Sequence, residues 1–189
     1  MTLPEDTRYL KGGPVAARII AEVKVAAEQA AAEGFAPKLV SITVGDVAAV
    51  DVYVRNQRAK AEQAGIGFEE RRYPAELTAE ELEAAIHGMN ADPRVTGIII
   101  QRPVPAHIPI KAIQAAIHPL KDVEGMHPAN MGAILYREPL LPPCTAAAAQ
   151  QLILHTGMDL RGAETVVVPP RGHAEHSVIA HGFIADGHT

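Results

Sequence analysis

The stretch that decides the fold is residues 97–130, GIIIQRPVPAHIPIKAIQAAIHPLKDVEGMHPAN. It opens with an apolar run at residues 98–100, which is typical of a strand buried on both faces. Gln101 ends the run, and Pro103 and Pro105 then exclude further ladder pairing because proline has no N–H to donate. A polar amide at the carboxyl end of a buried strand lies at the rim where α/β sheets bind ligands.

A second polar cluster follows the predicted strand. A helix is predicted over residues 110–117, and it returns the chain to Lys121-Asp122-Val123-Glu124-Gly125. Two carboxylates, a lysine and a glycine at the end of a turn suit a binding edge. A solvated loop is the alternative interpretation for this cluster when it is considered alone.

The chain before this stretch alternates between helical and strand patterns. Strands are predicted at residues 38–44, 68–73 and 97–101, and the second has a charged composition that favours a sheet edge. Helices are predicted at residues 14–33, 50–64 and 78–89, the last opening with a capping box of Thr78 and Glu81. This alternation predicts an α/β domain, a parallel sheet between layers of helices.

The pattern is less regular after the second cluster. Residues 131–143 are predicted to be irregular, and a helix is predicted over residues 146–155 with Thr145 as its cap. A short strand is predicted at residues 165–168.

Composition limits the class of protein. Apolar residues make up 48% of the 189 residues, aromatic residues only 4%, and tryptophan is absent, so the core must be built from Ala, Val, Ile and Leu. The net charge of −5 argues against nucleic acid as a partner. A single cysteine, Cys144, fits a reducing compartment, and we interpret it as a packed residue. With no signal-peptide pattern and no apolar stretch near ~18 residues, the sequence predicts a cytoplasmic protein without a membrane partner.

Two motifs in the central stretch carry a resemblance to a known family. QRPVP at residues 101–105, followed by KDVEGMHPANMG at residues 121–132, resembles the QLPLP and KDVDGFHPxNxG motifs of the bifunctional methylenetetrahydrofolate dehydrogenase/cyclohydrolase family. The resemblance implies that residues 1–143 form the folate-binding α/β domain, a three-layer parallel sheet. It implies that residues 144–189 hold a linking helix and a truncated remnant of the Rossmann-like NAD(P) domain.

The helix predicted at residues 50–64 departs from the family pattern. Family members carry Tyr-Val-x-x-Lys, in which the ring packs on the folate and the lysine handles a proton. Here Tyr53 is kept, but Gln57 occupies the lysine position. A carboxamide does not titrate and cannot act as a general acid or base. Lys60 lies about one helical turn further on, ~4.5–5 Å away along the axis, and we do not expect it to substitute.

The resemblance also names a set of site residues. It implies catalytic positions at Gln57, Gln101 and Glu124, and folate-binding positions at Tyr53, Gln101, Arg102, Asp122 and Glu124. Glu124 replaces an aspartate and places its carboxylate one methylene further out. Arg102 replaces a leucine and brings a cation to the rim.

The family's phosphate-binding glycine loop is not kept. The family pattern Gly-Arg-Ser-x-x-Val-Gly-x-Pro is replaced by PPRGHAEHS at residues 169–177. Pro169 has no N–H for a phosphate, and Glu175 places a negative charge where the second glycine would lie. We therefore expect no NAD(P) binding and name no cofactor-binding residue.

The C-terminal segment raises two further expectations. The four histidines at positions 173, 176, 181 and 188 include one pair with metal-ligand spacing, but no carboxylate or cysteine completes a site, so we expect no bound metal. An uncovered strand at residues 165–168 is a pairing template, which predicts a homodimer or higher oligomer that covers it.

Three functions remain open from the sequence. The first is an enzyme that binds a reduced folate, a 5,10-methylene-, 5,10-methenyl- or 10-formyl-tetrahydrofolate, and acts on its one-carbon unit without NAD(P). The second is a non-catalytic homologue that binds folate or a protein partner. The third is an ordinary methylenetetrahydrofolate dehydrogenase/cyclohydrolase.

Overall fold

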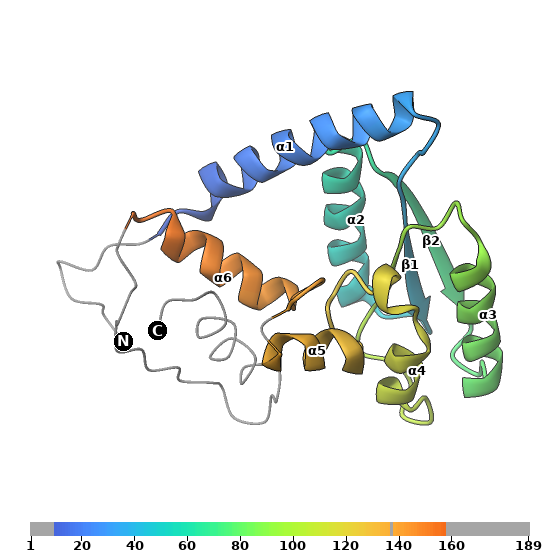
Figure 1. The fold of residues 1–189 in the computed structure, drawn as a ribbon. Helices are drawn as coiled ribbons and strands as arrows, with labels where there is room; N and C mark the ends of the chain where they lie inside the picture. Colours follow the sequence, from blue (N-terminus) through green and yellow to red (C-terminus); the bar gives the residue numbers. More distant parts are fainter. Residues whose placement is uncertain (1–9, 137, 158–189) are drawn as a thin grey trace.

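The computed structural model describes residues 10–136 and 138–157 (Figure 1). In chain order the helices and strands are α1 (Gly12–Ala32), β1 (Lys38–Val44), α2 (Ala48–Gln63), β2 (Gly67–Tyr73), α3 (Ala79–Ala91), β3 (Gly97–Ile100), α4 (Ile110–Ala116), the 3₁₀ turn η1 (Pro119–Lys121), α5 (Pro128–Leu135) and α6 (Cys144–Leu154).

The three strands form one parallel sheet in the order β2-β1-β3. Leu39 of β1 pairs with Phe68 of β2 on one side and with Gly97 of β3 on the other. The charged strand β2 lies at the edge of this sheet, as its composition predicts. The predicted α/β class with a parallel sheet is confirmed.

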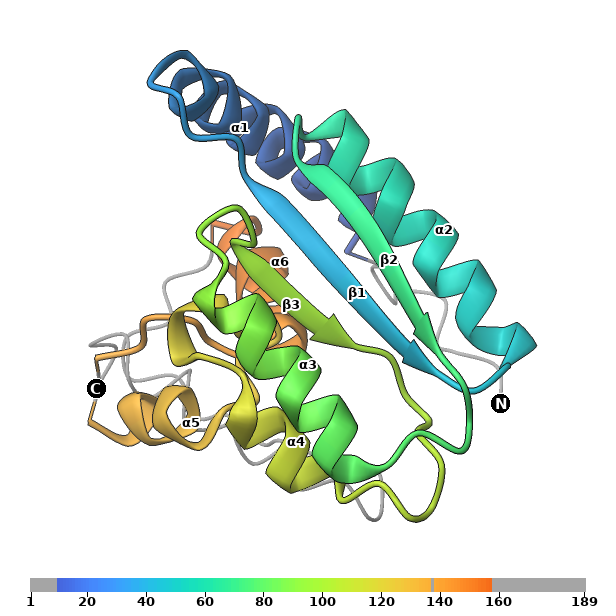
Figure 2. The same cartoon turned by 90° about the vertical axis from the view of Figure 1, so that its right-hand side faces the viewer.

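Helices cover both faces of the sheet. In Figure 1, α2 lies on one side of β1 and β2, and α3 lies on the other; Figure 2, viewed from the α3 side, shows α3 and α4 together in front of the strands. Side chains alternate along β1, and Val40, Ile42 and Val44 enter the core beneath α3 and α4. Ser41 and Thr43 therefore point to the opposite face, toward α2.

The ends of α3 follow local chemistry. Thr78 caps the helix by accepting from the Glu81 N–H, and the Glu81 carboxylate accepts from the Thr78 N–H, so the predicted capping box is confirmed. At the other end, the ammonium of Lys121 donates to the main-chain oxygens of Met89, Asn90 and Asp92 at 3.0, 2.7 and 2.8 Å. A cation at a helix C-terminus satisfies carbonyls that have no partner within the helix.

Two predictions after residue 127 were wrong. Part of the stretch expected to be irregular forms α5, which starts with Pro128 at its first position and is capped by the His127 imidazole accepting from the Ala129 N–H. Thr145 is not the cap of the next helix, because α6 begins earlier, after Pro143, and has no side-chain cap.

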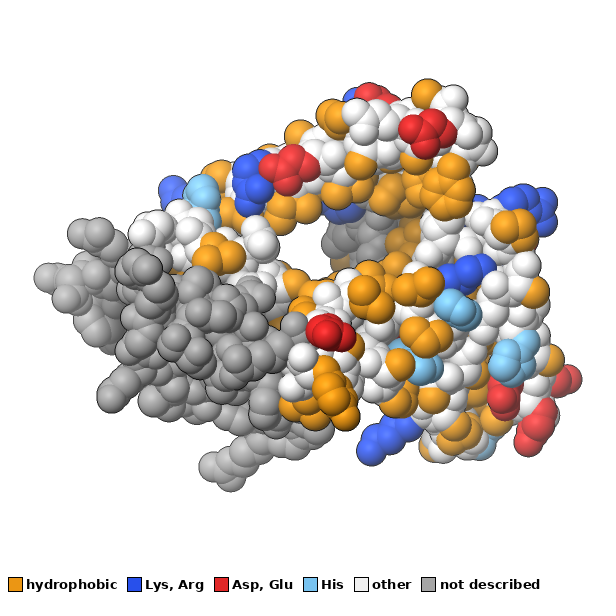
Figure 3. All heavy atoms as spheres, in the orientation of Figure 1, with side chains coloured by type: hydrophobic (Ala, Val, Ile, Leu, Met, Phe, Trp, Pro, Cys, Tyr) orange, Lys and Arg blue, Asp and Glu red, His pale blue; other side chains and the backbone are white. Residues whose placement is uncertain are grey.

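Helices α1 and α6 lie beside each other. The guanidinium of Arg18 donates to the side-chain oxygen of Gln151 at 3.3 Å, and Leu152 reaches Gly12. Figure 3 shows hydrophobic side chains on α1 along the opening between this helix and the rest of the molecule. Within residues 10–136 and 138–157, no helix is long and apolar enough to span a membrane.

The features predicted for the C-terminal segment lie outside the described residues. These are the strand at residues 165–168, the altered phosphate loop at residues 169–177 and the four histidines. The oligomer and the division at residue 143 stay predictions.

Candidate functional site

Gln101 lies at the carboxyl end of β3 with its side chain turned to the α2 face. Its main-chain N–H donates to the oxygen of Ile42, which continues the ladder by one bond. Its side-chain nitrogen donates to the Ser41 hydroxyl at 3.0 Å and to the Gln57 side-chain oxygen at 2.7 Å. Only 7% of Gln101 is exposed, so these bonds compensate for burying the amide.

Gln57 reaches this point from α2. It is half-buried, and its neighbour on the same helix face, one turn earlier, is Tyr53. Tyr53 is 67% exposed, so a large flat aromatic surface stands beside the Gln57–Gln101 contact. The structure thus brings together two of the predicted catalytic positions and places the predicted stacking residue next to them.

Sequence reasoning missed two polar residues of this cluster. Ser41 and Thr43 lie inside β1, 0% and 2% exposed, on the face that carries Gln101. The Ser41 hydroxyl accepts from Gln101, whereas the Thr43 hydroxyl has no hydrogen-bond partner within the described part of the chain. The available signal was the alternation of Ser and Thr with Val and Ile in KLVSITV, which marks one face of a buried strand as polar.

The loop that contains Glu124 runs alongside β3. Asp122 forms a parallel bridge with Ile98, and a methyl placed on Gly97 would come within 2.5 Å of Val123. Gly125 has a φ of +69°, and a methyl there would come within 2.5 Å of Pro142. Glycine at both positions allows these close approaches, which hold the loop between β3 and the segment before α6.

Two charged residues of the cluster have structural partners. The Lys121 ammonium binds the carbonyls at the end of α3, as described above. Asp122 is 3% exposed, and its carboxylate accepts from the His127 N–H at 2.7 Å and from the Asn130 side chain at 2.9 Å. Because these bonds hold the start of α5, we do not include Asp122 among the proposed folate-binding residues.

Glu124 lies near Cys144 at the start of α6. The Cys144 thiol donates to the Val123 carbonyl at 3.0 Å. Burial raises the pKa of this thiol, and the nearby carboxylates of Glu124 and Asp122 raise it further. A raised pKa disfavours the thiolate, which argues against a nucleophile. The prediction of a packed cysteine was wrong, because Cys144 as a whole residue is exposed even though its thiol is partly surrounded by protein.

The predicted residues therefore form two groups. Gln57 and Gln101 are in direct contact, with Tyr53 beside them. Glu124 is half-buried in the loop along β3, and no hydrogen bond among the described residues links it to Gln57 or Gln101. Arg102 follows Gln101 and is exposed at the rim.

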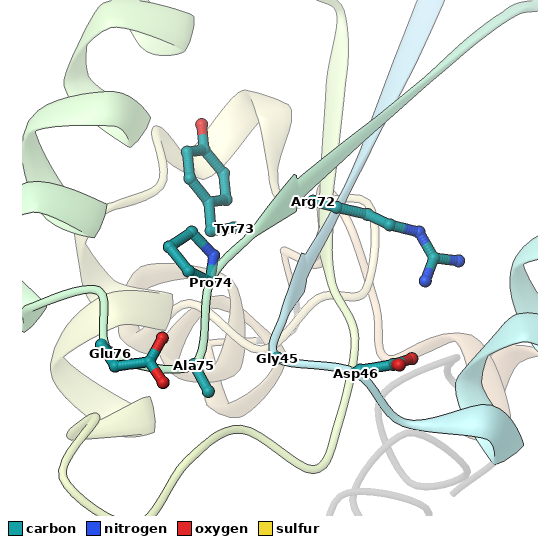
Figure 4. Close-up of a pocket in the computed structure, with 7 residues that line it drawn as sticks. All are labelled: Gly45, Asp46, Arg72, Tyr73, Pro74, Ala75 and Glu76. Atoms are coloured by element: carbon teal, nitrogen blue, oxygen red, sulfur yellow. The ribbon is translucent and has the colours of Figure 1, made fainter.

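A shallow pocket of about 520 Å³ lies at the same rim of the sheet, at the ends of β1 and β2. Figure 4 shows its lining residues, Gly45, Asp46, Arg72, Tyr73, Pro74, Ala75 and Glu76, none of which is a predicted site residue. The Arg72 guanidinium is held by the carboxylates of Asp51 and Glu70. This pocket therefore offers no uncommitted cation for an anionic ligand.

Within the residues that the structure describes, no group of three or more His, Cys, Asp or Glu side chains could hold a metal ion.

The structure defines an α/β domain with a polar cluster at the carboxyl-end rim of a parallel sheet, and comparisons with known proteins identify its family. Residues 10–124 match the family model described as "Tetrahydrofolate dehydrogenase/cyclohydrolase, catalytic domain". The chain therefore belongs to the tetrahydrofolate dehydrogenase/cyclohydrolase family.

Curated relatives extend the match. The chain is 70% identical over 175 residues to Bifunctional protein FolD 2 of Mesorhizobium japonicum, which covers 93% of this chain and 56% of the relative. It is 47% identical to Bifunctional protein FolD 2 of Ruegeria pomeroyi, covering 100% of this chain and 63% of that protein. The chain thus spans less than two thirds of the length of these relatives.

Solved structures share the fold. The bifunctional enzyme FolD from Campylobacter jejuni superimposes with a TM-score of 0.88 at 30% identity, covering 93% of this chain and 62% of that one. The Trypanosoma brucei FolD, solved with NADP cofactor and inhibitor, gives a TM-score of 0.85 at 30% identity, covering 97% and 62%.

Proposed function

We propose that this chain binds a reduced folate at the rim formed by the carboxyl ends of β1 and β3, and that it acts on the one-carbon unit of that folate. Family membership supports the ligand class, because the similar proteins are described as methylenetetrahydrofolate dehydrogenases and cyclohydrolases. The proposed site consists of Tyr53, Gln57, Gln101 and, further along the rim, Arg102 and Glu124.

The observation that carries the proposal is the hydrogen-bonded series Ser41–Gln101–Gln57, with the exposed ring of Tyr53 beside it. A fixed polar amide next to an uncovered aromatic face suits a flat, heteroaromatic ligand with hydrogen-bonding edges. Burying a polar side chain at a strand end costs free energy unless its polar groups form hydrogen bonds. Here Ser41, Gln57 and Gln101, from three separate segments of the fold, form these hydrogen bonds with one another.

The chemistry at this site is limited by what Gln57 can do. A carboxamide can orient a ligand or a water molecule, but it cannot take up or release a proton near neutral pH. We therefore propose that hydrolysis of 5,10-methenyltetrahydrofolate is slow, since a general acid–base group contributes typically ~10²–10⁴-fold. We further propose that activity does not require NAD(P), on the sequence grounds of Pro169 and Glu175, which lie outside the described residues.

A second candidate function is non-catalytic folate binding, which Gln57 also favours because it removes the titrating group. Both functions require folate binding, but only the first requires turnover of the folate. A third, the ordinary dehydrogenase/cyclohydrolase, requires NADP-dependent turnover.

Calorimetric titration of tetrahydrofolate and its 5-formyl and 5,10-methylene forms tests the shared part of the proposal. We expect saturable binding of at least one form and a loss of about fivefold or more in affinity for Gln101→Ala, the scale of a lost neutral hydrogen bond. The control is Lys60→Ala, an exposed residue of α2 that bonds only to Gln63 among the described residues.

The results separate the candidates. Absence of binding by all three folates contradicts the proposal. Binding with folate-dependent turnover in the absence of NAD(P) supports the enzyme, and binding without any turnover supports the non-catalytic protein.

A further inference from the structure

The carboxamide of Gln101 has one end fully engaged and one end free. Its nitrogen has two hydrogens, and these go to the Ser41 hydroxyl and the Gln57 oxygen. In the described part of the chain no group donates to the Gln101 oxygen. That oxygen is not among the buried polar atoms that lack a partner, so it keeps access to the surface. The group that Gln101 can offer to a ligand is therefore an acceptor.

The residue at position 57 determines which end is free. The Ser41 hydroxyl can donate or accept, so it is compatible with either orientation of the Gln101 amide. A side chain at 57 that only accepts holds the Gln101 nitrogen and leaves its oxygen for the ligand. A side chain at 57 that only donates, such as lysine, attracts the oxygen and leaves the nitrogen for the ligand. A glutamine at 57 can present either end of its amide, and in this structure Gln57 presents its oxygen to Gln101.

We propose that Gln57 is a specificity-determining residue: by accepting from Gln101 it turns the Gln101 oxygen toward the ligand and selects a folate that donates an N–H there. The inference rests on the proposed function. Tetrahydrofolate carries hydrogens on N5 and N10, whereas the neutral 5,10-methylene form has both replaced by the one-carbon bridge. The site therefore prefers an unbridged folate, tetrahydrofolate or its 10-formyl form, which keeps the N5 hydrogen and carries a one-carbon unit, over the bridged one.

Binding measurements on three proteins test this selection. The probes are tetrahydrofolate and 5,10-methylenetetrahydrofolate, the latter kept bridged with excess formaldehyde. We expect the wild-type chain to favour tetrahydrofolate by about three- to tenfold, the value of one neutral hydrogen bond. Gln57→Glu, which only accepts, should keep the preference, and Gln57→Lys, which only donates, should abolish or reverse it. Equal ratios in Gln57→Glu and Gln57→Lys would contradict the proposal.

The orientation of Gln101 can be measured without folate. In nuclear magnetic resonance spectra of the wild-type chain, the side-chain amide protons of Gln101 should show slowed exchange and contacts to the side chains of Ser41 and Gln57. Both signatures should persist in Gln57→Glu and be lost in Gln57→Lys. Amide protons of Gln101 that exchange freely in the wild type overturn the proposed orientation.

A second set of variants examines Ser41. Ser41→Ala removes one acceptor and should reduce the preference for tetrahydrofolate, and Ser41→Thr, which restores a hydroxyl, should recover it. If no variant binds any folate while the Gln101 signals behave as expected, the orientation is supported and the proposed function, together with the selection, is rejected. If folates bind but the preference is insensitive to residue 57, the selection alone is rejected.

Discussion

The side-chain nitrogen of Gln101 lies 2.7 Å from the side-chain oxygen of Gln57, which joins the end of β3 to the middle of α2. The two residues are 44 positions apart in the sequence and belong to different layers of the fold. The contact is neutral, so it does not change with pH over the physiological range. It places a non-titrating pair at the point where the family resemblance implies a proton-handling lysine.

Replacing Gln57 tests the contribution of this contact to stability. Gln57→Leu removes the acceptor and leaves one N–H of a 7%-exposed amide unpaired. We expect the free energy of unfolding to fall by about 1–2 kcal/mol, the cost of an unsatisfied polar group that water reaches only in part. Urea denaturation measures it, and Lys60→Leu on the same helix should change stability by less than ~0.5 kcal/mol.

Lys121 provides a second test, at the end of α3. Its ammonium is the donor to three main-chain oxygens, so Lys121→Met keeps much of the apolar stem and removes all three bonds. We expect a loss of about 2–3 kcal/mol, the range for hydrogen bonds to a charged group. Lys111→Met, an exposed position on α4, is the matched control. Similar effects of the two substitutions on the denaturation midpoint would contradict the capping role.

The sequence was sufficient to predict the elements of the sheet because each has a local signature. Apolar runs marked β1 and β3, the charged pattern marked β2 as an edge, and Thr78 with Glu81 marked the start of α3. The helix α5 was missed although Pro128 at its first position is a local start signal, because its cap is His127 rather than one of the usual capping residues, Ser, Thr, Asp or Asn.

The candidate site was predictable only in part, because its residues lie in local motifs but its contacts join distant segments. Gln57 and Gln101 were found through motifs, yet their direct contact and the Ser41 hydroxyl depend on residues up to 60 positions apart. Lys121 and Asp122 were assigned to a binding edge because two carboxylates, a lysine and a glycine at the end of a turn suit one. Their actual partners include main-chain groups, and these leave no trace in the sequence.

Two glycines with positive φ allow the cost of backbone strain to be distinguished from the cost of close packing. Gly125 and Gly34 have φ values of +69° and +86°, but a methyl on Gly34 meets nothing within 4 Å, whereas one on Gly125 meets main-chain atoms of residues 141–143 at 2.5–2.6 Å. We expect Gly34→Ala to cost about 1 kcal/mol from strain and Gly125→Ala about 3 kcal/mol or more, because packed backbone must move. Thermal denaturation of both variants measures the difference. Equal costs would show that the loop does not pack on this segment.

The pKa of the Cys144 thiol depends in part on the charge of Glu124. Because burial and the two carboxylates raise its pKa, the thiolate fraction at pH 8 is smaller than that of a free cysteine, and alkylation by iodoacetamide should be correspondingly slower. Glu124→Gln removes a negative charge, lowers the pKa and should increase the rate by about twofold or more. Glu80→Gln, in the first turn of α3, should leave it unchanged. A rate that is insensitive to Glu124 would place its carboxylate away from the thiol.

Tyr53 gives the most direct test of the proposed folate site. A tyrosine that is 67% exposed contributes little to the core, so Tyr53→Ala should change the free energy of unfolding by less than ~0.5 kcal/mol. If the ring stacks on the pterin or aminobenzoyl group, the same variant should weaken folate binding by about 1–3 kcal/mol, and Tyr53→Phe should retain most of the affinity because the flat face remains. Val52→Ala, the neighbouring exposed residue on α2, controls for general effects on the helix. A folate affinity that is the same for Tyr53→Ala and Val52→Ala would remove Tyr53 from the proposed folate site.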